Sequence, residues 1–395
     1  MLIEGDRISG IGNNLEGDDV IDGSHGILLP GLINTHTHVA MTHLRGHLDD
    51  ISLSEFLERT FKLDAERSED GIYNSSVIGM LEMIDSGVTS FLDLYYSEDI
   101  IERAVKATGI RGFLSWVTLD QEYTTQKGNP LDNARSFVSS EPATGLSSRS
   151  VGVQGVYVAG DETYVGAKEI ADRHKTILHS HLSETREEVY NHVRKTGKRP
   201  VEFLDSIGVL GDRFIAAHAA FVTLNEVRIL SRNKTKVSWN PISNAKLATG
   251  GICPVPEMLE EGVTVAVGTD SSGSNNSLSL LESMKFGGIT VNNSRWDPTV
   301  MTAQKILDAG TIGGAETLGR SDLGRIEVGK TADLILIDTR HPGLMNIDET
   351  NAVSGLVYSA NSSNVDSVII NGRILKRNHK LLSRFDDLKR GDFLR

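Results

Sequence analysis

The sequence predicts a (β/α)8 barrel of the TIM type, joined to a small discontinuous β-sandwich domain built from both chain ends. Three observations support this fold class. The chain has 395 residues, enough for one large α/β unit and a smaller part. Eight apolar runs alternate with amphipathic stretches, and both ends are rich in strand-forming residues. The alternative is an open doubly wound sheet, which we disfavour because no glycine-rich dinucleotide-binding turn follows the first run.

The predicted barrel strands are short apolar runs, most of them continuous rather than alternating. Such runs are typical of parallel strands that are buried on both faces. They occupy residues 28–36, 87–95, 109–117, 150–158, 174–182, 213–220, 235–241 and 262–270.

Amphipathic stretches between these runs predict the helices. Examples are residues 68–87, 97–109 and 254–262, each of which ends in glycine. Glycine is common just after the last helical residue, so these positions indicate where the helices end.

The two chain ends have a different pattern of short strands separated by turn residues. Residues 1–27 belong to this class, and so do ADLILIDTR, NAVSGLVYSA and VDSVIINGRILKRN after about residue 330. We therefore predict a small β-rich domain from residues 1–27 and 336–395, with the barrel formed by residues 28–335.

Composition narrows the class of protein. Apolar residues make up 39% and charged residues 24%, which excludes general disorder. The net charge of −13 argues against nucleic acid as the main partner. A single cysteine, Cys253, excludes both a disulfide framework and a thiolate-rich zinc site. No membrane span or signal peptide is recognisable, so we expect a cytoplasmic protein.

The strongest local motif is His36-Thr37-His38, at the predicted carboxyl end of the first barrel strand. Residues i and i+2 of a strand point to the same side, so both imidazoles can approach one ion. Histidine suits zinc or iron. Chance proximity is the alternative explanation for the motif taken alone.

A second His-x-His, His179-Ser180-His181, closes another predicted strand and is followed by Glu184. We predict His181 as a metal ligand and interpret His179 as packed. Glu184 is positioned to act as a general acid or base, although a first-turn helix acid would read the same way.

His218 and Asp270 end two further predicted strands. Taken singly, His218 could be a core histidine and Asp270 a turn former. Together with His36, His38, His181 and Glu184, they come from four strands and share one end of the barrel. Barrel active sites are assembled at that face, so these residues predict a metal site.

The segments PGLINTHTH, HSHLSET, AAHA, NPISNAKLATGG and GTDSSGSNN resemble the amidohydrolase superfamily. Within it, the chain resembles the cytosine-deaminase-like and chlorohydrolase-like branch, and is most similar to 5-methylthioadenosine/S-adenosylhomocysteine deaminases. The resemblance extends over nearly the whole chain.

The resemblance implies metal ligands His36, His38, His181 and Asp270, with Glu184 and His218 handling protons and orienting the substrate. Asp270 is also implied in catalysis and, with Glu184 and His218, in substrate binding. Binuclear members carry a bridging lysine on the fourth strand, and the predicted fourth strand has none. The resemblance therefore implies one divalent metal ion per subunit, with zinc favoured over iron.

Two positions depart from the deaminase pattern. The family's nucleoside-binding histidine is replaced within Gln154-Gly155-Val156-Tyr157, and Asp64 stands where the family has a ribose-binding glutamate. Compared with the family, the chain also begins late, which predicts that the first strands of the small domain are missing.

The resemblance implies a metal-dependent hydrolytic deaminase of an adenine nucleoside. An alternative keeps the site and changes the substrate to guanine, a cytosine-like base or an s-triazine. A third hypothesis is a non-enzymatic scaffold, which the intact ligand set disfavours. We expect a small-molecule nucleoside or N-heterocycle as partner, no nucleic acid or membrane, and a homo-oligomer.

Overall fold

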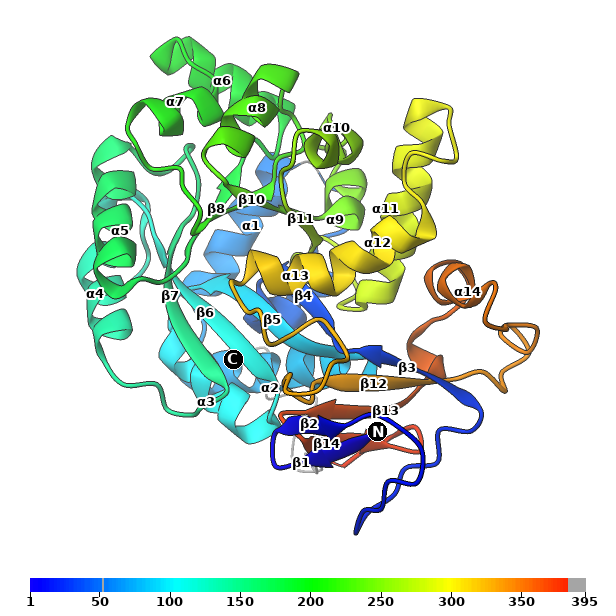
Figure 1. The fold of residues 1–395 in the computed structure, drawn as a ribbon. Coiled ribbons are helices and arrows are strands. Elements are labelled where there is room, and N and C mark those ends of the chain that lie inside the picture. The colour runs from blue at the N-terminus through cyan, green and yellow to red at the C-terminus, as the bar shows by residue number, and fades with distance from the viewer. Residues whose placement is uncertain (52, 383–395) are drawn as a thin grey trace.

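A computed structural model describes residues 1–51 and 53–382. Eight parallel strands form one sheet in sequential order and curve into a barrel, with helices around the outside (Figure 1). The barrel strands are β4 (Leu32–Thr37), β5 (Val88–Tyr95), β6 (Arg111–Thr118), β7 (Ser147–Val153), β8 (Leu178–Leu182), β9 (Phe214–His218), β10 (Lys236–Trp239) and β11 (Val265–Val267). The predicted fold class is confirmed, and each predicted run overlaps one of these strands.

The barrel closes between its first and last strands at their carboxyl ends. The backbone N–H groups of Thr269 and Asp270 both donate to the carbonyl of His36, at 3.2 and 2.9 Å. Every residue of β4 is buried, as expected for a strand covered on both faces.

Helices connect the strands and cover the barrel. They are α1 (Leu53–Ala65), α2 (Glu69–Asp85), α3 (Glu98–Thr108), α4 (Pro130–Ser139), α5 (Asp161–His174), α6 (Arg186–Thr196), α7 (Pro200–Ser206), α8 (Leu224–Arg232), α9 (Pro241–Lys246), α10 (Val255–Glu260), α11 (Leu280–Arg295), α12 (Ala303–Gly310), α13 (Ile312–Thr317) and α14 (Ala352–Tyr358). Three 3-10 helices are η1 (Val39–Leu44), η2 (Gln121–Tyr123) and η3 (Ser362–Asn364). The helices predicted at 68–87, 97–109 and 254–262 correspond to α2, α3 and α10.

The chain ends form antiparallel sheets beside the barrel (Figure 1). The larger sheet has the order β15 (Lys380–Leu381), β14 (Arg373–Arg377), β13 (Val365–Ile370), β12 (Leu334–Asp338) and β3 (Gly26–Pro30). A two-stranded sheet, β1 (Leu2–Glu4) and β2 (Arg7–Gly10), is linked to the C-terminal part by a bridge between Arg7 and Thr331. β3 spans the domain boundary predicted at 27/28, and β12 spans the boundary predicted at 335/336. The two strands pair with each other in the larger sheet.

Two details of the strand prediction are corrected. The run 28–36 is divided at Gly31, between β3 of the small sheet and β4 of the barrel. A Cβ at Gly31 would lie 2.0 Å from the Thr89 hydroxyl, so glycine permits this close passage. Residues 351–360, expected to be β-rich, contain helix α14, because Val353, Leu356 and Val357 recur at helical spacing and the last two are buried.

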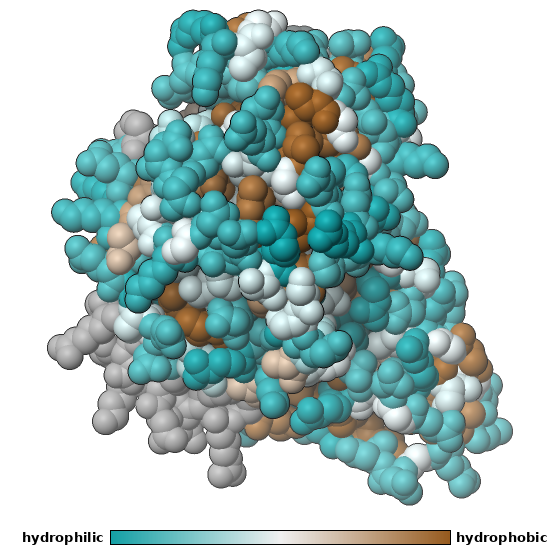
Figure 2. Space-filling view, turned by 90° about the vertical axis from the view of Figure 1, so that its left-hand side faces the viewer, coloured by the Kyte–Doolittle hydropathy of each residue, from teal (hydrophilic) through white to brown (hydrophobic). Residues whose placement is uncertain are grey.

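One face of the outer surface shows how apolar side chains are distributed. Figure 2 shows a mostly hydrophilic face on which apolar side chains are exposed in separate areas. No helix of the described residues has both the length and the apolar composition needed to cross a membrane.

Candidate active site at the carboxyl end of the barrel

Four histidines and one aspartate, positioned by the ends of four strands, converge at the carboxyl end of the barrel. Their potential ligand atoms form two overlapping groups, within each of which the atoms lie no more than 4.8 Å apart: His36, His38 and His181, and His36, His218 and Asp270. The Nε2 atoms of His38 and His181 are 3.2 Å apart. Asp270 Oδ1 lies 3.6 Å from His36 Nε2 and 3.4 Å from His38 Nε2. The structure therefore brings together all the residues predicted as metal ligands.

The Nε2 atoms of the three histidine rings are available to bind a metal. His38 Nδ1 donates to the carbonyl of Leu94 at 2.5 Å, and His181 Nδ1 donates to the carbonyl of Gln154 at 2.6 Å. A proton on Nδ1 leaves a lone pair on Nε2, as ligating histidines require. His36 Nε2 is buried and has no hydrogen-bond partner. These donors fit a divalent ion such as zinc.

Burial also sets the charge of these groups. It lowers the pKa of His36 to about 3, against the opposing influence of Asp270, and it lowers the pKa of His38 and His181. Burial opposes ionisation of Asp270, but the close approach of the His36 ring and the neighbouring histidines outweigh it and hold the pKa of Asp270 well below its usual range. At neutral pH, the set is therefore three neutral imidazoles and one carboxylate.

His179 is interpreted from the sequence as a packed residue, but the structure gives it a specific contact with the His36 ring. Its Nε2 lies 3.0 Å from His36 Nδ1, on the side of the ring opposite the convergent nitrogens. Residues i and i+2 on β8 both face the barrel interior, so the second histidine supports a neighbouring ring. The i, i+2 spacing in the sequence was the pattern that could have predicted this contact.

Glu184 lies between β8 and α6 and lines the cavity in front of these residues. Helix α6 has Thr185 as its N-cap, so Glu184 precedes the helix and is not one of its first-turn acids. Glu184 Oε2 is 3.8 Å from His218 Nε2. Burial, reinforced by the charge of Asp270, raises the pKa of Glu184 to about 8. The site therefore places a protonated carboxyl group near an ionised one.

Three polar residues that the sequence interpretation did not assign hold His218 and Asp270. Ser243 Oγ donates to Asp270 Oδ2 at 2.6 Å. The side-chain amides of Asn240 and Asn244 lie 3.3 and 3.0 Å from His218 Nδ1. All three belong to NPISN, at the start of α9. A polar segment directly after the seventh strand was the available indication, since that strand ends at the same face.

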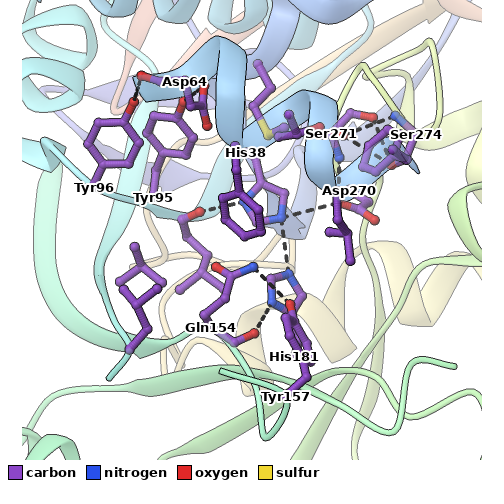
Figure 3. Close-up of a pocket in the computed structure, with 18 of the residues that line it drawn as sticks. His38, Asp64, Tyr95, Tyr96, Gln154, Tyr157, His181, Asp270, Ser271 and Ser274 are labelled. Carbon is purple, nitrogen blue, oxygen red and sulfur yellow. Dashed lines mark hydrogen bonds and ion pairs between the residues drawn. The ribbon is translucent and has the colours of Figure 1, made fainter. Parts of the chain in front are cut away.

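A cavity of about 890 Å³, part of it open to solvent, lies over the cluster. Figure 3 shows His38, His181 and Asp270 converging at its base, with Gln154 and Tyr157 on one side and Asp64, Tyr95 and Tyr96 on another. His43 and His47, which follow the first barrel strand in the sequence, are not among its described lining residues.

Asp64 projects from α1 into this cavity, at the level of Tyr95 and Tyr96 (Figure 3). Its Oδ1 accepts a hydrogen bond from Tyr95 Oη at 2.5 Å and lies 3.7 Å from an Arg67 nitrogen. Burial raises the pKa of Asp64, although Tyr95 and Arg67 oppose that change. Asp64 is therefore a cavity residue whose position is fixed, and its contact with substrate stays a prediction.

Gln154 and Tyr157 occupy the segment where the family histidine is replaced. The amide of Gln154 donates to Tyr157 Oη at 2.9 Å, while the backbone carbonyl of Gln154 accepts from His181. Between them, Gly155 has φ +146°, and a Cβ there would lie 2.5 Å from the Tyr157 ring. Glycine thus allows the ring to fold back beside His181.

The amidohydrolase family model matches residues 27–375, which is most of the chain. The chain belongs to the amidohydrolase family. This result confirms the resemblance inferred from the motifs at the strand ends.

Relatives cover nearly the full length. The chain is 37% identical over 391 residues to a 5′-deoxyadenosine deaminase of Methanobrevibacter smithii, covering 96% of this chain and 89% of the relative. It is 37% identical over 389 residues to a 5-methylthioadenosine/S-adenosylhomocysteine deaminase of Thermoanaerobacter pseudethanolicus, with coverage of 96% and 89%.

Solved structures share the fold. An adenosine deaminase from Xanthomonas campestris with bound zinc superposes with a TM-score of 0.87 at 29% identity, over 92% of this chain and 83% of that one. An atrazine chlorohydrolase from Arthrobacter aurescens, complexed with zinc, has a TM-score of 0.88 at 24% identity, with coverage of 98% and 92%. The second match bears on the fold alone.

Proposed function

We propose that this protein is a metal-dependent hydrolase that deaminates an adenine nucleoside of the 5′-methylthioadenosine or S-adenosylhomocysteine type. The product would be the corresponding inosine derivative and ammonia. The observation that carries the proposal is the convergence of three histidines and Asp270 at one cavity, which Glu184 and His218 also line. The near full-length likeness to adenine nucleoside deaminases supports the choice of substrate class.

His36, His38, His181 and Asp270 would hold one divalent ion, with zinc preferred to iron. When bound, such an ion lowers the pKa of a water from 15.7 toward about 7 and so supplies a nucleophile at neutral pH. β7 contains no lysine that could bridge a second ion. This favours a mononuclear site.

The chain's own residues then move the protons. Glu184 donates its proton to the ring nitrogen beside the amino-bearing carbon, which makes that carbon more electrophilic. Asp270 accepts a proton from the attacking water while Ser243 holds its other oxygen, and His218 orients that water. The Asp270 proton passes to the amino group, which leaves as ammonia. The new hydroxyl returns a proton to Glu184 as the C=O bond forms.

Ammonia release provides the test of this function. We expect adenosine derivatives to be deaminated with a higher kcat/KM than free bases or triazines. Activity on guanine, a cytosine-like base or an s-triazine that is tenfold higher than on every adenosine derivative would support the alternative substrate class. A protein with no metal and no ammonia release from any of these compounds would support the scaffold hypothesis. The expected cytoplasmic location and homo-oligomeric state stay predictions.

A further inference from the structure

A second glutamate, Glu188 in the first turn of α6, is buried next to the segment that carries Glu184. Its Oε2 accepts a hydrogen bond from the backbone N–H of Glu184 at 2.8 Å, and its Oε1 accepts one from the backbone N–H of Ser183 at 3.0 Å. A longer contact of 3.4 Å joins Oε2 to the backbone N–H of Thr185. One carboxyl group therefore binds three consecutive backbone N–H groups, and that of Glu184 is the central one.

The contacts of Glu188 extend beyond those of an ordinary capping box. In that motif, a glutamate at the third helical position binds the backbone N–H of the N-cap residue. Glu202 of α7 binds Arg199 in this way at 3.1 Å. Glu226 of α8 binds Thr223 in the same way at 2.8 Å. The bond from Glu188 to its N-cap is the longest of its three, and the two shorter bonds reach residues that precede the helix. Glu188 therefore fixes the loop before α6 as well as the end of the helix.

The loop needs such support because its backbone conformation is uncommon. Ser183 is buried and has φ +49°, in the left-handed region that residues other than glycine rarely adopt. A residue holds this conformation only where its surroundings fix it. Here the carbonyl of Ser183 accepts from the N–H of Phe221 at 2.9 Å, and its own N–H donates to Glu188. This turn follows β8 directly and precedes Glu184, the residue that lines the cavity.

We infer that Glu188 is a positioning residue for Glu184, because it fixes the backbone from which the Glu184 side chain reaches the substrate. This inference rests on the proposed function, in which Glu184 donates a proton to a ring nitrogen. Such a transfer requires the carboxyl oxygen to lie within about 2.6–3.2 Å of that nitrogen. A displacement of about 1 Å can reduce the rate by about 100-fold. Glu188 is not among the described residues that line the cavity, so it acts through Glu184 and not by touching the substrate.

Two substitutions of Glu188 test this role in the metal-loaded protein. Glu188→Gln leaves one accepting oxygen in place of two, and Glu188→Asp keeps both oxygens but shortens the side chain by one methylene group. We expect kcat to fall by about 10–100-fold in each variant, while KM and metal content stay within about twofold of the wild-type values. Glu202→Gln, which weakens the capping box of α7, is the matched control and should leave kcat unchanged. Denaturant titration shows which variants are folded, and either folded variant of Glu188 decides the comparison.

A double mutant separates positioning of Glu184 from a general loss of stability. If Glu188 acts through Glu184, adding Glu188→Gln to Glu184→Gln should lower kcat by no more than about threefold further, because the proton donor is already absent. A purely structural role predicts the same fold-loss in both backgrounds. Unchanged kcat in the Glu188 variants, or equal losses in the two backgrounds, would overturn the inference and leave the deaminase function intact. Failure of the wild-type protein to release ammonia from any nucleoside would overturn both.

Discussion

The two ends of the barrel bury polar side chains in opposite ways. At the amino end, Arg111 opens β6 and makes two hydrogen bonds of 3.0 Å to Asp333, with both side chains only 4% exposed. Asn371 accepts a further bond from the same guanidinium. At the carboxyl end, His36 Nε2 is also buried but has no hydrogen-bond partner among the described residues, and the nearest carboxylate oxygen, Asp270 Oδ1, lies 3.6 Å away. A buried polar group that is hydrogen-bonded within the protein contributes to stability, whereas a buried polar atom without a hydrogen-bond partner is available to bind a ligand.

The largest effect should come from removing a proposed metal ligand at the carboxyl end of the barrel. His181→Ala is expected to abolish metal binding and reduce turnover by more than about 10⁴-fold, because one imidazole donor is lost. Metal analysis and ammonia release measure both effects, and His341→Ala, at an exposed position, is the control. Two tightly bound ions per wild-type chain would contradict the mononuclear proposal.

Glu184→Gln, at the carboxyl end of the barrel, should show that this side chain is needed for proton transfer and not for metal binding. The amide keeps the shape of the side chain but cannot donate the carboxyl proton, so turnover should fall by about 10²–10⁴-fold while metal content stays the same. Glu187→Gln, in the exposed first turn of α6, is the matched control. Loss of metal in Glu184→Gln would make Glu184 a ligand instead.

Substitutions at the amino end of the barrel should change the free energy of unfolding. Arg111→Ala leaves the Asp333 carboxylate buried without its partner, which costs about 3–5 kcal/mol in free energy of unfolding. Denaturant titration measures this. Arg228→Ala removes an ion pair whose arginine is 60% exposed, and should change stability by no more than about 0.5 kcal/mol. Similar losses in the two variants would contradict the contrast between buried and exposed pairs.

Asp64 tests whether a carboxyl group in the cavity contacts the sugar. Asp64→Ala should raise the KM for adenosine derivatives by about 5–150-fold and spare free adenine-like bases, because only the nucleosides present ribose hydroxyls. Asp64→Asn, which keeps the side-chain volume beside Tyr95, is the control for lost packing. If bases and nucleosides are affected equally, Asp64 acts through Tyr95 and Arg67 rather than on the sugar.

The pH profile should give the smallest and most gradual effect. Because the pKa of Glu184 is raised to about 8, its carboxyl group keeps a proton at neutral pH and loses it as the pH rises. We therefore expect kcat/KM to fall about tenfold per pH unit above pH 8. This decline should be absent from the residual activity of Glu184→Gln. A decline of the same midpoint in that variant would assign it to another group.

Local pattern predicted the barrel strands well, because the strands within runs such as 87–95 and 213–220 are fully buried and mostly apolar. It failed at Gly31, where one continuous apolar run serves two sheets, since nothing in the run itself marks the change of partner. It also failed for residues 351–360, where valine and other strand-forming residues pack as a short helix. In that segment, tertiary packing outweighs intrinsic preference.

The site residues that could be predicted from the sequence are those at the carboxyl ends of predicted strands. His36, His38, His181, His218 and Asp270 each close a predicted strand, so barrel geometry alone brings them together. The roles of Ser243 and Asn244 could not be predicted in this way. Their contacts with Asp270 and His218 depend on the path of α9, which side-chain spacing does not determine.

Barrel closure has a consequence for the timing of biosynthesis. The carbonyl of His36 binds the backbone N–H of Asp270, a residue that the ribosome adds 234 positions later. At typical elongation rates, roughly 10–50 s separate the synthesis of the first and last residues of the cluster. A nascent chain that ends before residue 270 lacks both this closing bond and the cluster's only carboxylate. Assembly of the complete cluster is therefore a late event, which requires that the chain has been translated at least as far as Asp270.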